Sequence, residues 1–286
     1  MHVVPPAFLV PAIVLAVAFI VIPSIGGLAL SFTDYVGFGS ASWVGLDNYI
    51  AILSDDQARA SLGNTFAMAA LVVLGQNLFG LGLALALERA FPGRDLLRVI
   101  FLLPAILSPV IIGFLWQYLY APEGAINTAL HAVGLGSLAT PWLGNPATAL
   151  GAVALASVWQ LTGYAMVIYV AGLHGVSADV LAAASLDGAG AWQRLIHIKL
   201  PLLAPAITIN VALSLIGGLR LFDQILAMTG GGPGYATETL ATVIYKEGFV
   251  YGNVGYSLAL SIVLACFVAV FAGIQVSFTR KAEFNQ

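Results

Sequence analysis

The chain has 286 residues, of which 60% are hydrophobic and 8% charged, and its mean hydropathy is +0.98. Soluble domains carry about 25% charged residues, so this composition excludes an ordinary soluble globular protein. The formal net charge of −3 does not indicate a nucleic-acid-binding protein, and one cysteine, Cys266, excludes an intramolecular disulfide. Most of the chain is therefore expected to lie in a lipid bilayer.

Six continuous apolar stretches are long enough to cross a bilayer as helices, because a hydrocarbon core about 30 Å thick needs roughly 20 residues per span. The predicted spans are residues 7–30, 66–87, 99–120, 150–173, 203–228 and 254–278. A cleaved signal peptide is the alternative for the first span, but its apolar region is too long and no basic residue precedes it. The sequence therefore predicts an all-α polytopic membrane protein with six transmembrane helices.

Basic residues gather in alternate loops. The loops after spans two, four and six carry Arg89, Arg94, Arg98, Arg194, Lys199, Arg280 and Lys281, whereas the other loops carry Arg59 and Lys246. Because Lys and Arg are enriched in cytoplasmic loops, we expect both chain termini and the loop after span four to lie in the cytoplasm.

One water-compatible segment, residues 177–201, lies between spans four and five. Ser177 is suited to cap a short alanine-rich helix that has Asp179 in its first turn. Gly188 can adopt the left-handed conformation that ends a helix, and Pro201 suits the first turn of the next helix. The residues alone leave two interpretations open: a helical turn lying on the bilayer surface, and a docking element for a cytoplasmic partner.

The exact residues of this segment favour the second interpretation. Asp187-Gly188-Ala189, followed after eight residues by Ile198-x-Leu200-Pro201, resembles the cytoplasmic "EAA" signature of permease subunits of binding-protein-dependent ATP-binding-cassette (ABC) importers. The family commonly has Glu at the first position of the signature, where this chain has Ala182. The resemblance implies a coupling helix that contacts the ATPase through Ala182, Ala183, Ala184, Asp187, Gly188, Ala189, Ile198, Leu200 and Pro201.

Three further stretches extend the resemblance. Residues 30–35, 44–49 and 228–233 are similar to the maltose and glycerol-3-phosphate type of carbohydrate-uptake permease. The resemblance implies a type I ABC importer permease fold in a bacterial or archaeal cell membrane, with a first helix and external loop at residues 1–61, a permease domain at 62–278 and a cytoplasmic tail at 279–286. It also implies three kinds of partner: a second, different permease chain, two ATPase subunits and an extracytoplasmic solute-binding protein.

Enzyme motifs are absent from the sequence. There is no G-x-x-x-x-G-K-[ST] phosphate loop, and none of the three lysines follows a glycine. The four histidines show no metal-ligand spacing, and no H-E-x-x-H or G-x-S-x-G motif occurs. We therefore expect no catalytic residue, metal or cofactor on this chain, with ATP and Mg²⁺ bound by the partner ATPase.

Polar residues within the spans are candidates for the translocation pathway, because such groups are costly in lipid. Arg220 and Asp223 lie three residues apart in predicted span five, so one helical face would let them partly neutralise each other. The predicted pathway residues are Asn210, Arg220, Asp223, Gln224, Gln160 and Tyr164. A structural ion pair and interhelical hydrogen bonds are the alternatives for these residues.

The solute is expected to be a neutral sugar or oligosaccharide, because Arg220 is the single basic residue within a span and is offset by Asp223. Glycerol-3-phosphate or a related polar solute is the alternative. Trp116, Tyr118, Tyr120 and Trp159 are suited either to stacking on sugar rings or to an interfacial aromatic belt. Two other functions are weighed: an ATP-independent secondary transporter, which would predict an inverted repeat, and an intramembrane enzyme.

Overall fold

The computed structural model describes residues 9–284, so Ala7 and Phe8 of the first predicted span lie outside the described residues. Within residues 9–284 the secondary structure is helical, apart from an isolated bridge between Thr33 and Trp43. Four unbroken helices are long and apolar enough to span a membrane, and two bent helix pairs raise the total to as many as six. The predicted all-helical membrane fold is confirmed.

The chain divides into two compact units, and the first combines residues up to Arg59 with Val243–Cys266. Its elements are α1 (Val10–Ala16), the π-helical turn η2 (Val17–Val21), α2 (Ile22–Leu30), α3 (Asp47–Ser54), the π-helical turn η5 (Lys246–Val250) and most of the apolar part of α15 (Val254–Phe284). The elements α1, η2 and α2 form one continuous helix that corresponds to span one.

The segment that follows α2 folds back onto the end of that helix. The Asn48 side chain donates hydrogen bonds to the carbonyl oxygens of Ser31 and Thr33, at 2.8 and 2.9 Å. The Tyr49 hydroxyl lies 2.6 Å from Ser31 Oγ. Asn48 and Tyr49 thus hold the loop in place by satisfying polar groups at the end of the first span.

The second unit contains Ala60–Thr242 and the end of α15 from Phe267 onward. Its elements are α4 (Asp56–Ala86, which begins in the first unit), α5 (Arg94–Ile106), α6 (Pro109–Leu119), α7 (Ala125–Ala132), the short 3₁₀ turn η3 (Gly136–Leu138), α8 (Pro146–His174), α9 (Ala178–Leu186), α10 (Ala191–Arg194), the π-helical turn η4 (Leu195–Lys199), α11 (Leu200–Leu202), α12 (Ala204–Leu219), α13 (Asp223–Met228) and α14 (Leu240–Tyr245, which ends in the first unit).

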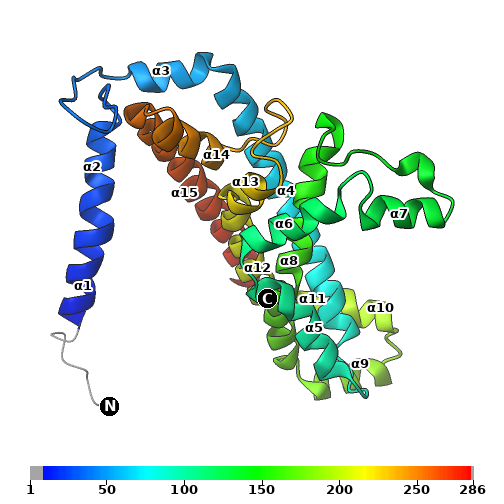
Figure 1. Ribbon diagram of the computed structural model, residues 1–286. Helices are drawn as coiled ribbons and strands as arrows, with labels where there is room; N and C mark the ends of the chain where they lie inside the picture. Colours follow the sequence, from blue (N-terminus) through cyan, green and yellow to red (C-terminus); the bar gives the residue numbers. More distant parts are fainter. Residues whose placement is uncertain (1–8, 285–286) are drawn as a thin grey trace. The chain divides into compact units, whose positions relative to one another are not determined.

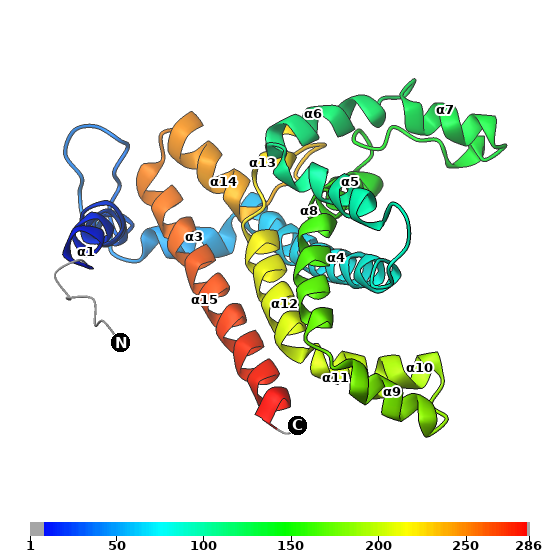
Figure 2. The same ribbon diagram turned by 90° about the horizontal axis from the view of Figure 1, so that it is seen from below.

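Helix α8 is the centre of the second unit and packs against α5, α6, α12 and α13 (Figure 2). Glycines allow the close contacts, since membrane helices approach each other where side chains are small. A Cβ atom on Gly163 of α8 would lie 2.0 Å from the carbonyl oxygen of Phe101 on α5. A Cβ atom on Gly218 of α12 would lie 2.7 Å from Cα of Ala69 on α4.

Predicted span three is not one straight helix. Helices α5 and α6 meet at an angle of 100°. Leu107 and Ser108 between them are extended, with ψ angles of 150° and 134°. The physical reason is Pro109, which lacks an N–H and pushes the residue before it out of the helical conformation. The continuous helix predicted over residues 99–120 is therefore wrong.

Predicted span five is interrupted at both ends. The chain bends by 69° between the helix that ends at Leu202 and α12, which begins at Ala204. Helix α12 ends at Leu219, and α13 begins only at Asp223, so the continuous helix predicted over residues 203–228 is also wrong. Span six behaves differently, because α15 continues to Phe284, past its predicted end at residue 278.

Two of these breaks, the one before Pro109 and the one between α12 and α13, expose backbone carbonyl groups that buried side chains satisfy. Gln160 Nε2 donates to the carbonyl oxygen of Leu107 at 3.0 Å, and Thr239 Oγ1 donates to that of Leu221 at 3.0 Å. Non-helical backbone is tolerated at membrane depth only where such groups find partners. The breaks are therefore supported features of the fold.

Candidate functional site

Residues 177–201 form a helical hairpin at the end of α8, where α9 and α10 lie side by side (Figures 1 and 2). Ser177 Oγ accepts a hydrogen bond from the backbone N–H of Asp179 at 3.2 Å, which confirms the predicted N-cap of α9. Gly188 has φ = +82°, which confirms the predicted left-handed turn. Helix α8 separates this hairpin from the α7 region by 29 residues, about 43 Å at roughly 1.5 Å per residue.

The second arm of the hairpin is also held by local contacts. Gln193 Oε1 accepts a hydrogen bond from the N–H of Gly190 at 2.8 Å, where the arm begins. Arg194 on this arm donates to the hydroxyl of Ser185 on α9. Helical structure then continues through η4 and α11 to Leu202. The hairpin therefore has a defined structure, and its second arm continues as helix into the segment that precedes α12.

The hairpin presents apolar side chains to its surroundings. Leu186 is 90% exposed and Trp192 is 71% exposed, and Val180 is exposed as well. Exposed apolar groups on a polar segment are suited to contact with a protein partner or with the bilayer surface. The hairpin therefore has the features of a docking element.

The predicted coupling residues occupy different parts of this hairpin. Ala182, Ala183, Asp187 and Gly188 are exposed, whereas Ala184, Ala189, Ile198, Leu200 and Pro201 are partly buried. A pocket of about 330 Å³ is lined by residues from both arms, namely Asp187, Gly188, Ala189, Gln193, His197 and Ile198. The exposed members of the set are accessible at the surface of the hairpin, and the others are packed against neighbouring residues.

An ion pair ties the hairpin to the end of α4. Lys199 Nζ lies 2.5 Å from Glu88 Oε2, and the two side chains are 18% and 26% exposed. Arg98 on α5 donates to the carbonyl oxygen of the neighbouring Leu87 at 2.8 Å. The sequence analysis did not pair Glu88 with Lys199. The one feature that could have suggested this pair is that both residues lie in loops assigned to the cytoplasmic side.

Among the predicted pathway residues, Gln160 and Gln224 bind each other. Gln224 Nε2 donates to Gln160 Oε1 at 2.9 Å, and the side chains are nearly completely buried, with residue exposures of 3% and 2%. Asn210 is also buried and donates to the carbonyl oxygen of Ala165 at 3.2 Å. These amides join helices, which agrees with the interhelical alternative considered above.

The other predicted pathway residues are exposed, and the expected pairing of Arg220 with Asp223 is not found. Arg220 follows the end of α12 and Asp223 begins α13, so they do not share a helical face. Among the described residues no ion pair joins them. Tyr164, Arg220 and Asp223 are each exposed.

A hydrogen-bonded cluster links three membrane helices and includes a residue that sequence reasoning missed. Asn77 on α4 donates to Ser214 Oγ on α12 at 3.0 Å and accepts from the Tyr169 hydroxyl on α8 at 2.6 Å. Tyr169 had not been selected, although a tyrosine within an apolar span needs a partner for its hydroxyl group. The cluster holds α4, α8 and α12 together.

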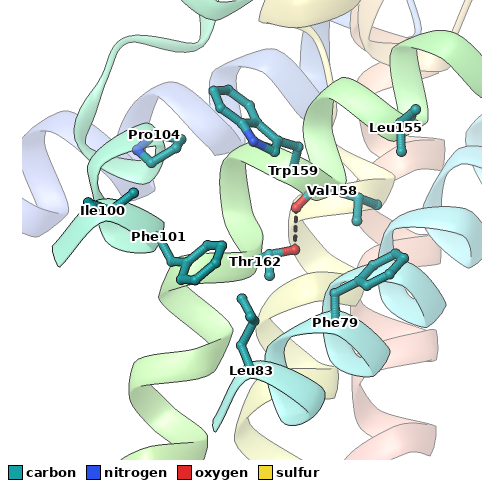
Figure 3. A pocket seen from close by; sticks show the side chains of 9 residues that line it. All are labelled: Phe79, Leu83, Ile100, Phe101, Pro104, Leu155, Val158, Trp159 and Thr162. Atoms are coloured by element: carbon teal, nitrogen blue, oxygen red, sulfur yellow. Dashed lines mark hydrogen bonds between the residues drawn. The ribbon is translucent and has the colours of Figure 1, made fainter. Parts of the chain in front are cut away.

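An apolar pocket of about 390 Å³ lies between α4, α5 and α8 (Figure 3). Its lining residues are Phe79, Leu83, Ile100, Phe101, Pro104, Leu155, Val158, Trp159 and Thr162. The hydroxyl of Thr162 donates to the Val158 carbonyl oxygen at 2.6 Å, as the dashed line in Figure 3 shows. The pocket therefore offers little hydrogen bonding to a hydroxyl-rich solute.

The aromatic residues considered for sugar stacking mainly pack on one another. The Trp116 ring lies 5.6 Å from that of Trp159 and 5.1 Å from that of Tyr120, between ring centroids. Tyr120 is buried and Tyr118 is exposed. Within residues 9–284 no group of three His, Cys, Asp or Glu side chains is arranged to hold a metal ion.

The sequence matches a known protein family, and the fold is similar to that of a solved structure. Residues 76–283 match the family described as "Binding-protein-dependent transport system inner membrane component". The chain is similar to a crystal structure of a bacterial ABC transporter involved in the import of the acidic polysaccharide alginate, with a TM-score of 0.84, 24% identity, and coverage of 96% of this chain and 94% of that one.

Curated relatives match over nearly their full length. A probable starch degradation products transport system permease protein of Thermoanaerobacterium thermosulfurigenes is 32% identical, covering 96% of this chain and 94% of the relative. The sn-glycerol-3-phosphate transport system permease protein of Agrobacterium fabrum is 34% identical, covering 98% and 95%. The trehalose/maltose transport system permease protein of Thermococcus litoralis is 33% identical, covering 92% and 88%.

These matches show what kind of subunit the chain is and with which kinds of protein it works. It is a multi-pass membrane subunit without catalytic activity of its own, and it works with a solute-binding protein and with an ATPase that binds ATP. The chain belongs to the family of binding-protein-dependent transport system inner membrane components, the permease subunits of ABC importers.

Proposed function

We propose that this permease imports a sugar or oligosaccharide and that residues 177–201 are its contact with the ATPase. The observation that carries the coupling role is the hairpin itself, with Leu186 90% exposed and Trp192 71% exposed at its surface. Relatives named for starch degradation products and for trehalose and maltose support the sugar as solute. Membership of an ABC family sets aside the secondary transporter and the intramembrane enzyme.

Glycerol-3-phosphate remains a second candidate solute because of Arg220. The preference for a neutral solute assumed that Asp223 offsets this charge, yet Arg220 is exposed and forms no ion pair with a described residue. A free guanidinium group suits a phosphate oxygen. The similarity to the Agrobacterium fabrum permease supports the same candidate.

The proposed assembly contains a second, different permease chain, two ATPase subunits and an extracytoplasmic binding protein. Both termini and the hairpin are placed in the cytoplasm, because basic residues concentrate in the loops on that side. Closure of the ATPase dimer would then push on the hairpin and shift the spans between inward-facing and outward-facing states. ATP binding favours one of the two states through its different affinity for each.

Fewer residues are assigned to contact with the solute than the sequence predicted. Tyr164, Arg220 and Asp223 are exposed and are assigned to contact with the solute. Asn210, Gln160 and Gln224 are buried and hydrogen-bonded to other helices or to each other, so they are assigned to holding the pathway in shape. Weak, reversible contacts from exposed groups suit a solute that must also be released.

Purification of the assembled importer tests the coupling role. The tagged chain is isolated in mild detergent with its co-expressed partners, and mass spectrometry quantifies the ATPase. Leu186→Asp is expected to remove most of the ATPase, because it places a charge in an apolar contact. Val133→Asp is the matched control, since Val133 is also exposed but lies beyond the opposite end of α8. Full ATPase recovery with Leu186→Asp would reject the docking role.

Ligand binding by the partner binding protein tests the solute. Maltose, maltotriose, trehalose and glycerol-3-phosphate are compared by isothermal titration calorimetry. We expect a sugar to bind, followed by uptake of the labelled sugar into proteoliposomes that contain the complete importer. Binding of glycerol-3-phosphate with no response to any sugar would select the second candidate, and uptake would then depend on Arg220.

A further inference from the structure

We propose that the ion pair between Lys199 and Glu88 transmits movement of the hairpin to α4, as a second link beside the covalent path into α12. The proposal rests on the ATPase-docking role of residues 177–201. Both residues act as positioning residues, since neither is assigned to contact with the solute or with ATP. Both side chains lie outside the EAA signature positions.

The location of Lys199 makes it suited to this role. Lys199 is the last residue of η4, on the arm that leaves the hairpin, and only three helical residues and Leu203 separate it from α12. The chain bends by 69° in this interval, so a push along the arm is not directed along the axis of α12. A side contact at Lys199 therefore carries part of the movement before the bend.

Glu88 is equally suited to receive the movement of the hairpin. It lies in the turn that follows the end of α4 at Ala86, and the carbonyl oxygen of neighbouring Leu87 accepts a hydrogen bond from Arg98. The turn that carries Glu88 is therefore held from the α5 side as well. Since Asn77 on α4 contacts both Ser214 on α12 and Tyr169 on α8, movement of α4 reaches the other membrane helices.

The surroundings favour a strong contact between the two side chains. Both are partly removed from solvent, so their attraction is less screened than that of a surface pair. A pocket of about 390 Å³ at this point is lined by Glu88, Arg89, Leu181, Ala191, Arg194 and Lys199. Glu88 is the one acidic residue in this lining, so its loss would leave three basic groups facing one another.

The ion pair differs from three other salt bridges among the described residues. Those join Arg59 to Asp56, Arg94 to Asp95 and Arg98 to Asp95, in each case within one element or its first turn. The pair between Lys199 and Glu88 instead joins residues 111 positions apart in the chain. Asp95→Asn is therefore a matched control, because it removes a carboxylate near the same membrane end without breaking a link to the hairpin.

The test uses the complete importer in proteoliposomes, with ATP as the probe. Two rates of ATP hydrolysis are measured, one with a saturating amount of the purified binding protein and one without it. The readout is the ratio of the first rate to the second. Glu88→Gln and Lys199→Met are each expected to reduce this ratio at least twofold while the amount of co-purified ATPase stays unchanged. Asp95→Asn is expected to keep the wild-type ratio.

Charge exchange separates an ion pair from a merely structural effect. Glu88→Lys and Lys199→Glu are each expected to lower the ratio, and the double variant with both changes is expected to exceed either one. Recovery is expected to be partial, since a lysine at position 88 would lie beside Arg89 and Arg194. The proposal is overturned if the neutral variants keep the wild-type ratio or if the exchange gives no recovery.

Loss of the ATPase from the neutral variants would also overturn the proposal, because the pair would then shape the docking surface and carry no movement. Failure of the docking role itself is recognised separately. In that case Leu186→Asp retains the ATPase, whatever the charge variants do.

Discussion

Gln224 donates a 2.9 Å hydrogen bond to Gln160, and this contact joins α13 in broken span five to α8. Gln224 lies at the start of α13, just after the break in span five. Gln160 lies on unbroken α8 and also donates to the Leu107 carbonyl at the break in span three. One buried side chain therefore stabilises both breaks, and the two bent regions depend on each other through it.

Gln160→Leu is expected to destabilise the chain, because it leaves the Leu107 carbonyl and the Gln224 amide without their partner. A buried polar group without a hydrogen bond costs about 1–3 kcal/mol. The measurement is the apparent unfolding temperature in detergent. Gln117→Leu is the control, since Gln117 is exposed and its contact with the Met228 carbonyl is long, at 3.4 Å. Equal unfolding temperatures for the two variants would contradict the proposed dependence.

Gly163→Ala is expected to disrupt the packing of α5 on α8. The added methyl group would lie 2.0 Å from the Phe101 carbonyl oxygen, which is backbone and cannot rotate away. Overpacking of this kind costs about 1–3 kcal/mol or more. Gly151→Ala on the same helix is the control, because its Cβ would meet nothing within 4 Å. Size-exclusion chromatography should show less monodisperse protein for Gly163→Ala alone.

Gly188→Ala is expected to weaken recovery of the ATPase. The left-handed conformation at Gly188, with φ of +82°, costs a residue with a side chain about 1–2 kcal/mol, although the site is open. The turn would shift and move Leu186 relative to Trp192. Gly190→Ala is the control, since Gly190 has φ of −67°. Wild-type ATPase recovery with Gly188→Ala would show that docking does not need this turn.

Arg220→Gln and Asp223→Asn are expected to act independently on uptake, because Arg220 follows the end of α12, Asp223 begins α13, and no ion pair joins them in the described part of the chain. The fold reductions of the single variants should multiply in the double variant. The measurement is the initial uptake rate of the solute identified with the binding protein. An interaction larger than about 0.5 kcal/mol would instead restore the paired interpretation.

Local patterns in the sequence predicted most of the hairpin. A cap at Ser177 and a left-handed turn at Gly188 depend on the side chains and backbone freedom of a few neighbouring residues, so they can be inferred without the fold. The arrangement of the pathway residues could not be inferred from local patterns. Periodicity placed Arg220 and Asp223 on one helix, but the helix ends between them, where the distant Thr239 satisfies the freed carbonyl group of Leu221.

The sequence by itself determined the class of protein, the approximate spans and the position of the hairpin. Lipid demands long apolar runs, and capping and turn preferences act over a few residues. Only the tertiary structure decided where the spans break and which polar groups meet. The contacts of Gln160 with Gln224 and of Lys199 with Glu88 join residues 64 and 111 positions apart. Such contacts arise from helix packing, which local periodicity does not encode.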